Sequence, residues 1–253
     1  MKKVAPVAAL LAVVLAACSP APRKAAAPVA PASATTPGPL YVAVGASETT
    51  GVGAATPLRE AWPRVLFRTA MPATTVFVNM GIPGATVAQA IQMELPQTLE
   101  LKPQIVTVWL NVNDLVAGVS AADFERSLGN LVHQLRRGGQ ARVLVANTPP
   151  VDHLPAYLAC RPDPPAAAPP CRAPGGGLLP PPDQLDQQVA DYNAATARIA
   201  SAEGATLVDL FAVGMAARAA GIEDALVSPD GFHPNAGGYQ QVATAFAAAL
   251  KRP

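Results

Sequence analysis

Short apolar runs alternate with amphipathic stretches along most of the chain. Each run is nearly continuous in valine, leucine and isoleucine, a pattern typical of strands that are buried on both faces. The five runs are LYVAVG (40–45), TTVFVNM (74–80), QIVTVWLN (104–111), ARVLVAN (141–147) and ATLVDL (205–210). We therefore predict five strands with two buried faces each.

The stretches between these runs have the apolar spacing of helices. They cover residues 58–70, 86–102 (with Pro96 inside), 120–139 and 183–204, and a final helix lies near the end of the chain. The alternation of strand and helix predicts right-handed crossovers. The expected fold is α/β: a five-stranded, parallel, doubly wound sheet with helices on both sides.

One segment interrupts this alternation after the fourth run. Residues 148–182 contain 12 of the 28 prolines and two cysteines, Cys160 and Cys171. Connections of this length are usually functional lids or disordered insertions. Because this one leaves the carboxyl end of a strand, we predict a lid.

The amino terminus has the layout of an export signal. Two lysines precede an apolar run that is too short to span a bilayer, and small residues follow it. The letters LAAC, ending at Cys18, resemble a bacterial lipobox, which implies cleavage before Cys18 and lipid attachment to it. The alternative is ordinary cleavage near residues 25–27, with Cys18 removed.

The next segment is rich in alanine, proline, serine and threonine and has almost no large apolar residue. Such a composition cannot bury enough surface to fold. We predict a signal peptide at 1–17, a lipid-anchored disordered linker at 18–39 and one folded domain at 40–253, which contains the lid. The protein is thus expected to be exported and held at a membrane, facing the periplasm or the cell surface.

Charge and cysteine content agree with this location. Without Lys2 and Lys3 of the signal peptide, 16 basic residues stand against 17 acidic ones, so nucleic acid is not an expected partner. If Cys18 carries lipid, Cys160 and Cys171 remain as a pair. Outside the cytoplasm a disulfide is expected, because two thiols without further ligands nearby make a poor metal site.

Polar residues follow four of the predicted elements. GASETTGVG comes after the first run, GIPGAT after the second, and NVND ends the third, while DGFHPN precedes the last helix. In an open parallel sheet, ligands bind beyond the carboxyl ends of the strands. These four segments are therefore expected to meet at one edge.

The residue types in these segments suit acyl transfer. Ser47 would be the nucleophile and His233 the base that takes its proton. Asp230 would fix the tautomer of the imidazole and stabilise its charged form. An oxyanion hole would consist of the backbone N–H groups of Ser47 and Gly84 and the side-chain amide of Asn113. No metal or cofactor is required.

This set of motifs resembles the SGNH (GDSL-type) esterase and lipase superfamily over nearly all of residues 40–250. The resemblance implies a flavodoxin-like three-layer α/β/α sandwich and a serine hydrolase. Secondary features of the superfamily also match: AWPRVL, NTPP, Tyr192–Asn193 and LVDL. Its signature positions correspond to Ser47, Gly84, Asn113 and the pair Asp230 and His233.

The chain departs from the superfamily pattern at two positions. Ala46 stands where the first block usually has aspartate, and Glu48 follows the serine. Asn111 stands where the third block usually has glycine, so its side chain either crowds the oxyanion site or helps to form it.

Neither a P-loop nor a GxSxG elbow is present in the sequence, which argues against a nucleotide enzyme and an α/β-hydrolase proper.

The expected activity is hydrolysis of carboxylic esters through an acyl-enzyme, on a small-molecule or lipid ester. Two alternatives remain open: removal of acetyl groups from cell-wall or other polysaccharides, and a non-catalytic binding lipoprotein on the same scaffold. The other two histidines, His133 and His153, are expected to lie at the surface. The sequence does not predict an oligomeric state.

Overall fold

The computed structural model describes residues 38–166, 168, 170–171 and 179–252 of the 253-residue chain. The predicted signal peptide, Cys18 and nearly all of the predicted linker lie outside these residues. No helix of the described part is long and apolar enough to cross a membrane.

Five parallel strands form one sheet in the order β2-β1-β3-β4-β5. This order, with helices on both faces, is the flavodoxin-like doubly wound arrangement that the sequence predicts. The first strand coincides with its predicted range, and the others begin and end one or two residues inside theirs. The strands are β1 (Leu40–Gly45), β2 (Val76–Asn79), β3 (Ile105–Trp109), β4 (Arg142–Ala146) and β5 (Thr206–Val208).

The described helices connect these strands or follow them. Two single turns of 3₁₀-helix, Arg137–Gly139 and Asp224–Leu226, accompany them. The α-helices are α1 (Ser47–Thr50), α2 (Pro57–Glu60), α3 (Trp62–Ala70), α4 (Val87–Met93), α5 (Leu95–Leu101), α6 (Val112–Val116), α7 (Ala121–Arg136), α8 (Pro155–Cys160), α9 (Pro182–Glu203), α10 (Leu210–Ala219) and α11 (Ala236–Leu250).

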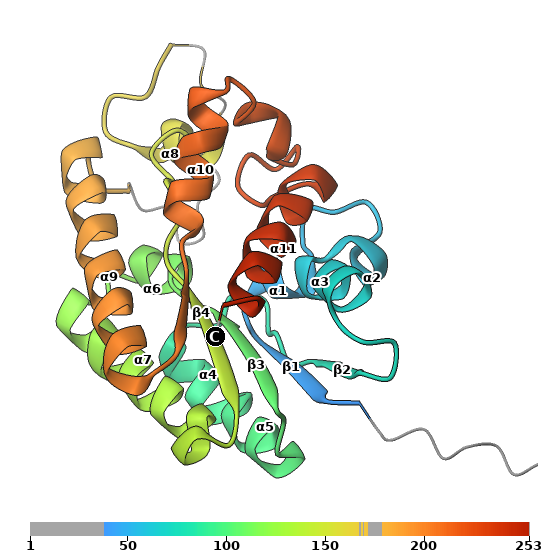
Figure 1. Ribbon diagram of the computed structural model, residues 1–253. Helices are drawn as coiled ribbons and strands as arrows, with labels where there is room; N and C mark the ends of the chain where they lie inside the picture. Colours follow the sequence, from blue (N-terminus) through green and yellow to red (C-terminus); the bar gives the residue numbers. More distant parts are fainter. Residues whose placement is uncertain (1–37, 167, 169, 172–178, 253) are drawn as a thin grey trace, which may run out of the picture. The chain divides into compact units, whose positions relative to one another are not determined.

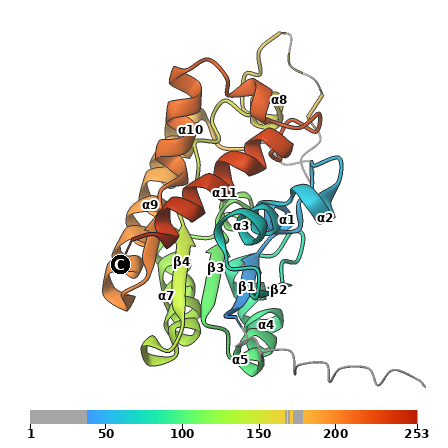
Figure 2. The same ribbon diagram turned by 45° about the vertical axis from the view of Figure 1, so that its right-hand side comes forward.

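Each face of the sheet has its own apolar core. Helices α4, α5, α7 and α9 cover one face of the sheet (Figures 1 and 2). On this face Phe124 stacks on Tyr192 with ring centres 3.9 Å apart. Helices α3 and α11 cover the other face, where Trp62 stacks on Phe246 at 4.2 Å. The three-layer sandwich that the resemblance implies is therefore present.

The edge strand β2 differs from its prediction. Val76 is 56% exposed and none of the four residues is fully buried. The apolar run predicted burial on both faces, but an edge strand has a neighbour on one side only, and the helices cover it incompletely.

Two predicted helices are each divided in two by the structure. The stretch 58–70 forms α2 and α3, and the stretch 86–102 forms α4 and α5. Pro63 and Pro96 occupy the second position of α3 and α5, where a missing N–H leaves no hydrogen bond unmade. A new helix therefore starts just before each proline.

The described part of the predicted lid is attached to the domain at several points. It includes a short helix, α8, and its Tyr157 packs in a third apolar cluster with Val112 and Val189. The Tyr157 hydroxyl donates a hydrogen bond to the Pro180 carbonyl at 2.9 Å. A disulfide joins Cys160, the last residue of α8, to Cys171.

Reduction of this disulfide is expected to lower the free energy of unfolding by about 3 kcal/mol, because the short covalent loop no longer restricts the unfolded chain. Urea unfolding with and without reductant measures the change. The double variant Cys160→Ala/Cys171→Ala is the control and should not respond to reductant. Two free sulfhydryls from this pair in unfolded, unreduced protein would contradict the pairing.

Candidate active site

Ser47 lies in a tight turn between β1 and α1. It is 7% exposed and is the first residue of α1, directly beyond the carboxyl end of the strand. Gly45 permits this turn, because a Cβ atom there would lie 2.8 Å from the Trp109 carbonyl oxygen. The hydroxyl is thus placed at the edge of the sheet where the sequence predicts the site.

Asp230 and His233 are paired in the loop before α11. Their Oδ2 and Nδ1 atoms are 2.7 Å apart, and the Asp230 Oδ1 atom accepts from the backbone N–H groups of Phe232 and His233. Burial alone would raise the pKa of Asp230, but these hydrogen bonds lower it below its usual value. The carboxylate therefore stays ionised and holds the imidazole by its Nδ1 atom.

The loop that follows α1 packs against this histidine. A Cβ atom on Gly53 would lie 2.7 Å from His233 Cβ, and Gly53 has a φ of +93°, which favours glycine. The Tyr239 hydroxyl on α11 donates to the Val52 carbonyl. The serine segment and the histidine segment are therefore in direct contact.

The Ser47 hydroxyl itself donates to Glu48 Oε2 at 3.3 Å. It makes no hydrogen bond to the imidazole of His233, and both residues belong to the described part of the chain. Catalytic hydrogen bonds are often long or misaligned without substrate.

The proposed oxyanion residues Gly84 and Asn113 lie close together. The Asn113 amide donates to the carbonyl of Ala85, the neighbour of Gly84, at 3.0 Å. Gly84 has a φ of +82°, and a Cβ atom there would meet no atom within 4 Å, so its conformation and not space favours glycine. Asp114 fixes the same turn by accepting from the Val87 N–H with both oxygens, at 3.1 and 3.2 Å.

The turn after β2 also contacts α1. The Asn79 amide donates to the Thr49 carbonyl at 2.7 Å, and the Ile82 N–H donates to the Gly45 carbonyl at 2.9 Å. Together with the Asn113 contact, these bonds place the second and third motifs beside the serine turn. All four motifs therefore converge on one edge of the sheet.

Asn111, one of the two departures, is buried at 3% exposure. Its amide nitrogen has no hydrogen-bond partner among the described residues. A buried donor without a partner is costly. The structure thus leaves a free donor on the residue directly before α6.

Glu94 is a residue of this site that the sequence analysis missed. It is 1% exposed and lies between α4 and α5, and its Oε2 atom accepts from the Gly45 N–H at 2.9 Å. Burial raises its pKa to about 8, although the Gly45 hydrogen bond opposes the shift. The only signal in the sequence was that Glu94 stands between two apolar residues, Met93 and Leu95, two positions before Pro96.

The other two histidines lie away from this cluster. His133 on α7 is exposed and its Nδ1 atom is 2.9 Å from Glu203. His153 lies 3.3 Å from Glu223, which is bonded to Arg218. No group of three or more possible metal ligands occurs in the described part of the chain.

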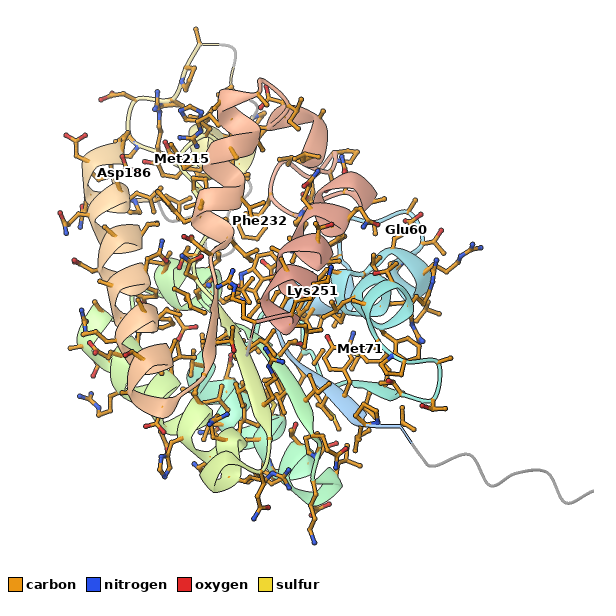
Figure 3. The ribbon with its side chains drawn as sticks, viewed as in Figure 1. Glu60, Met71, Asp186, Met215, Phe232 and Lys251 are labelled. Carbon is orange, nitrogen blue, oxygen red and sulfur yellow. A yellow bond between two sulfur atoms is a disulfide. The ribbon has the colours of Figure 1, made fainter. Side chains whose placement is uncertain are left out.

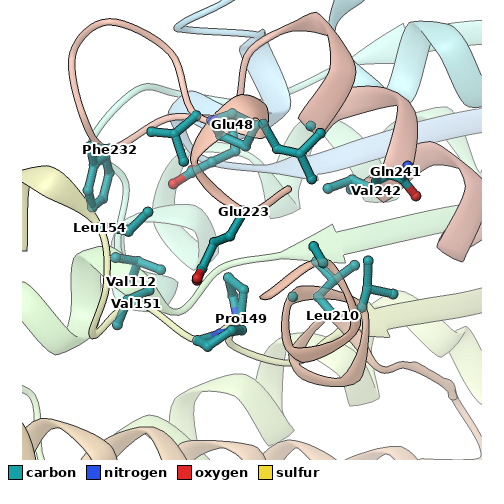
Figure 4. A pocket seen from close by; sticks show the side chains of 18 of the residues that line it. Glu48, Val112, Pro149, Val151, Leu154, Leu210, Glu223, Phe232, Gln241 and Val242 are labelled. Carbon is teal, nitrogen blue, oxygen red and sulfur yellow. The ribbon is translucent and has the colours of Figure 1, made fainter. Parts of the chain in front are cut away.

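A pocket with a free volume of about 130 Å³ lies next to the serine turn (Figure 4). Phe232 and Pro234, on either side of His233, form part of its wall. Phe232 lies in the space between α10 and α11 (Figure 3). Four residues of the predicted lid, Pro149, Pro150, Val151 and Leu154, form another part of the wall, and Glu48 borders the pocket on the serine side.

Solved structures with the same fold cover most of the chain. TesA has 19% identity and a TM-score of 0.61 over 84% of this chain and 98% of its own. The lipase/acylhydrolase from Enterococcus faecalis has 17% identity and 0.61 over 84% and 95%. Axe2, an acetylxylan esterase from Geobacillus stearothermophilus, has 18% identity and 0.61 over 85% and 95%. At these identities the likeness shows the fold, a flavodoxin-like α/β/α sandwich.

The family follows from the sequence. The profile of the GDSL-like lipase/acylhydrolase family matches residues 43–241, which include all four motifs, and the chain belongs to this family of hydrolases. No curated protein sequence matches the chain.

The variant Glu94→Gln is expected to flatten the dependence of stability on pH. The folded protein keeps a proton on Glu94 up to about pH 8, whereas the unfolded chain releases it near the ordinary pKa of 4.5. The free energy of unfolding therefore falls between these values, by at most about 1.4 kcal/mol per pH unit. Glutamine keeps the acceptor for Gly45 and removes the proton.

Urea unfolding between about pH 6 and pH 8 measures this effect. Burial raises the pKa of Asp114 to about 6, so this pH window excludes most of the contribution of Asp114 to the pH dependence of stability. Glu100→Gln, the same substitution at an exposed position of α5, is the matched control and should keep the wild-type slope. Equal slopes for Glu94→Gln and wild type would contradict the assignment.

Proposed function

We propose that the protein is an exported serine esterase that hydrolyses carboxylic esters through an acyl-enzyme. The observation that carries this proposal is the Asp230–His233 pair, at 2.7 Å, in contact with the segment that bears Ser47. Membership of a family of lipases and acylhydrolases supports the same chemistry.

In this proposal His233 takes the proton of the Ser47 hydroxyl as the oxygen attacks the ester carbonyl. The negative oxygen of the intermediate accepts hydrogen bonds from the Ser47 and Gly84 N–H groups and from Asn113. His233 then gives its proton to the departing alcohol. Water attacks the acyl-enzyme by the same route, releasing the acid and restoring the serine.

We further propose that the mature chain begins at Cys18 with a lipid anchor and that residues 18–39 tether the 40–253 domain to a membrane. The proposal rests on the LAAC letters and on the composition of the linker. Mass spectrometry of the mature amino terminus tests it. An unmodified start beyond residue 18 would rule out the anchor.

A second candidate substrate class is acetylated polysaccharide. One observation favours it: Axe2, which shares the fold, is an acetylxylan esterase. Comparison of acetyl-sugar polymers with longer acyl esters separates the two classes.

Ser47→Ala should lower the hydrolysis of short p-nitrophenyl esters by about four orders of magnitude or more, because the nucleophile is lost. Circular dichroism checks that the fold is kept. Thr69→Ala on α3 is the control, since it also removes a hydroxyl, one that bonds the Val65 carbonyl of its own helix, and it should keep most of the activity. A fluorophosphonate probe should label the wild type and not Ser47→Ala; retained activity in that variant would overturn the assignment.

A histidine base predicts a rate that falls at acidic pH, because a protonated imidazole cannot accept the serine proton. Initial rates with p-nitrophenyl acetate from about pH 5 to pH 8 measure this fall. His133→Ala should keep the same profile, because that imidazole is exposed on α7 and lies against Glu203. A flat wild-type profile would argue against a histidine base.

A further inference from the structure

Glu48 places a buried carboxylate directly beside the nucleophile. The residue is 8% exposed, and its Oε2 atom accepts the hydrogen bond of the Ser47 hydroxyl. The letters of the family name, GDSL, put a leucine after the serine, where this chain has Glu48. A charged group thus occupies a position for which the family pattern has an apolar one.

The same side chain borders the pocket behind the catalytic turn. Most of the wall is apolar and includes Trp109, Val112, Leu210 and Val242. Figure 4 shows the carboxyl groups of Glu48 and Glu223 facing this space. The carboxyl group of Glu48 therefore connects the serine hydroxyl with an apolar pocket.

The two carboxylates of the pocket differ in whether a neighbouring cation balances their charge. Both oxygens of Glu223 accept from Arg218 at 2.9 Å, and His153 lies beside it. Glu48 forms no ion pair with any described residue, and the described ionisable groups near it are His233, Asp230 and Tyr239. Its charge is therefore sensitive to what fills the pocket.

Burial raises the pKa of Glu48 above its usual value. Its own backbone N–H, the nearby His233 and the Ser47 hydroxyl act in the opposite direction, and Asp230 raises it further. An apolar chain in the pocket would remove water from the carboxylate, which is costly for the charged form and much less so for the neutral form.

The size of the pocket limits its occupant. A cavity of about 150 Å³ in another protein accommodates benzene, so the present volume of about 130 Å³ suits a chain of about six carbons. Phe232 and Pro234, the neighbours of His233 in the chain, line the pocket. It therefore lies next to the proposed base, where the acyl part of an ester would lie.

We propose that Glu48 determines the acyl specificity of the esterase: with its carboxyl group neutral the pocket admits a chain of about six carbons, and with the group ionised the enzyme acts on acetyl esters in preference. This inference rests on the proposed function and adds the substrate class. It predicts that acyl preference changes with pH.

The experiment measures the ratio of kcat/KM for p-nitrophenyl hexanoate to that for the acetate, from about pH 5.5 to pH 9. Protonation of His233 affects both esters alike and cancels in the ratio. In the wild type the ratio should fall as the pH rises, by about tenfold or more. In Glu48→Gln and Glu48→Leu it should be higher than in the wild type at pH 9 and independent of pH.

Two further variants test whether the acyl chain of the ester binds in this pocket. Glu94→Gln alters a second buried glutamate, which accepts from the Gly45 N–H but does not border the pocket. This variant should keep the pH dependence of the ratio. Ala217→Phe fills the pocket from α10 and should lower the ratio at every pH.

One outcome would overturn the inference but not the proposed esterase function. In that outcome the wild type hydrolyses the acetate ester, its ratio is constant with pH, and Glu48→Gln has the same ratio. Absence of any ester hydrolysis by the wild type would instead contradict the proposed function, and the inference would fall with it. The wild-type ratio needs no variant, so it decides the matter even if Glu48→Gln does not fold.

Discussion

The parallel pairing of β1 with β2 on one side and β3 on the other is the constraint on which the site depends. Parallel strands bring their carboxyl ends to the same edge, so the turns that follow these strands must meet there. The turn of Ser47 lies in the middle and receives bonds from the turn after β2. The loop of His233 does not follow a strand but precedes α11. The packing of α11 on the sheet therefore places this loop at the same edge.

Much of this arrangement follows from the sequence. Apolar runs of strand length predicted the positions of β1 and β3 closely, because each of these strands is buried between two neighbouring strands. The motif spacing predicted the contact of Asp230 with His233, since three residues in a glycine-containing turn let the carboxylate reach the ring. Exposure of β2 was not predictable, because a run of valines does not indicate whether a helix will cover it.

The carboxylates around the serine were beyond sequence reasoning for a different reason. Glu94 is distant from Gly45 in the chain, and only the packing of the α4–α5 junction against β1 makes it the partner of the Gly45 N–H. Glu48 was visible as a departure, yet its contact with an apolar pocket depends on α10 and α11. Burial by distant elements, and not local pattern, sets the charge of both groups.

One hydrogen bond joins the proline-rich segment to the turn of His233, the proposed base: the Ala156 N–H on α8 donates to the Gly231 carbonyl at 3.0 Å. A shift of α8 away from this turn would break the bond and free the peptide between Asp230 and Phe232. The position of α8 is thereby coupled to the alignment of the imidazole. The disulfide joins the last residue of the same helix to Cys171, so the covalent loop and the turn of His233 share one helix.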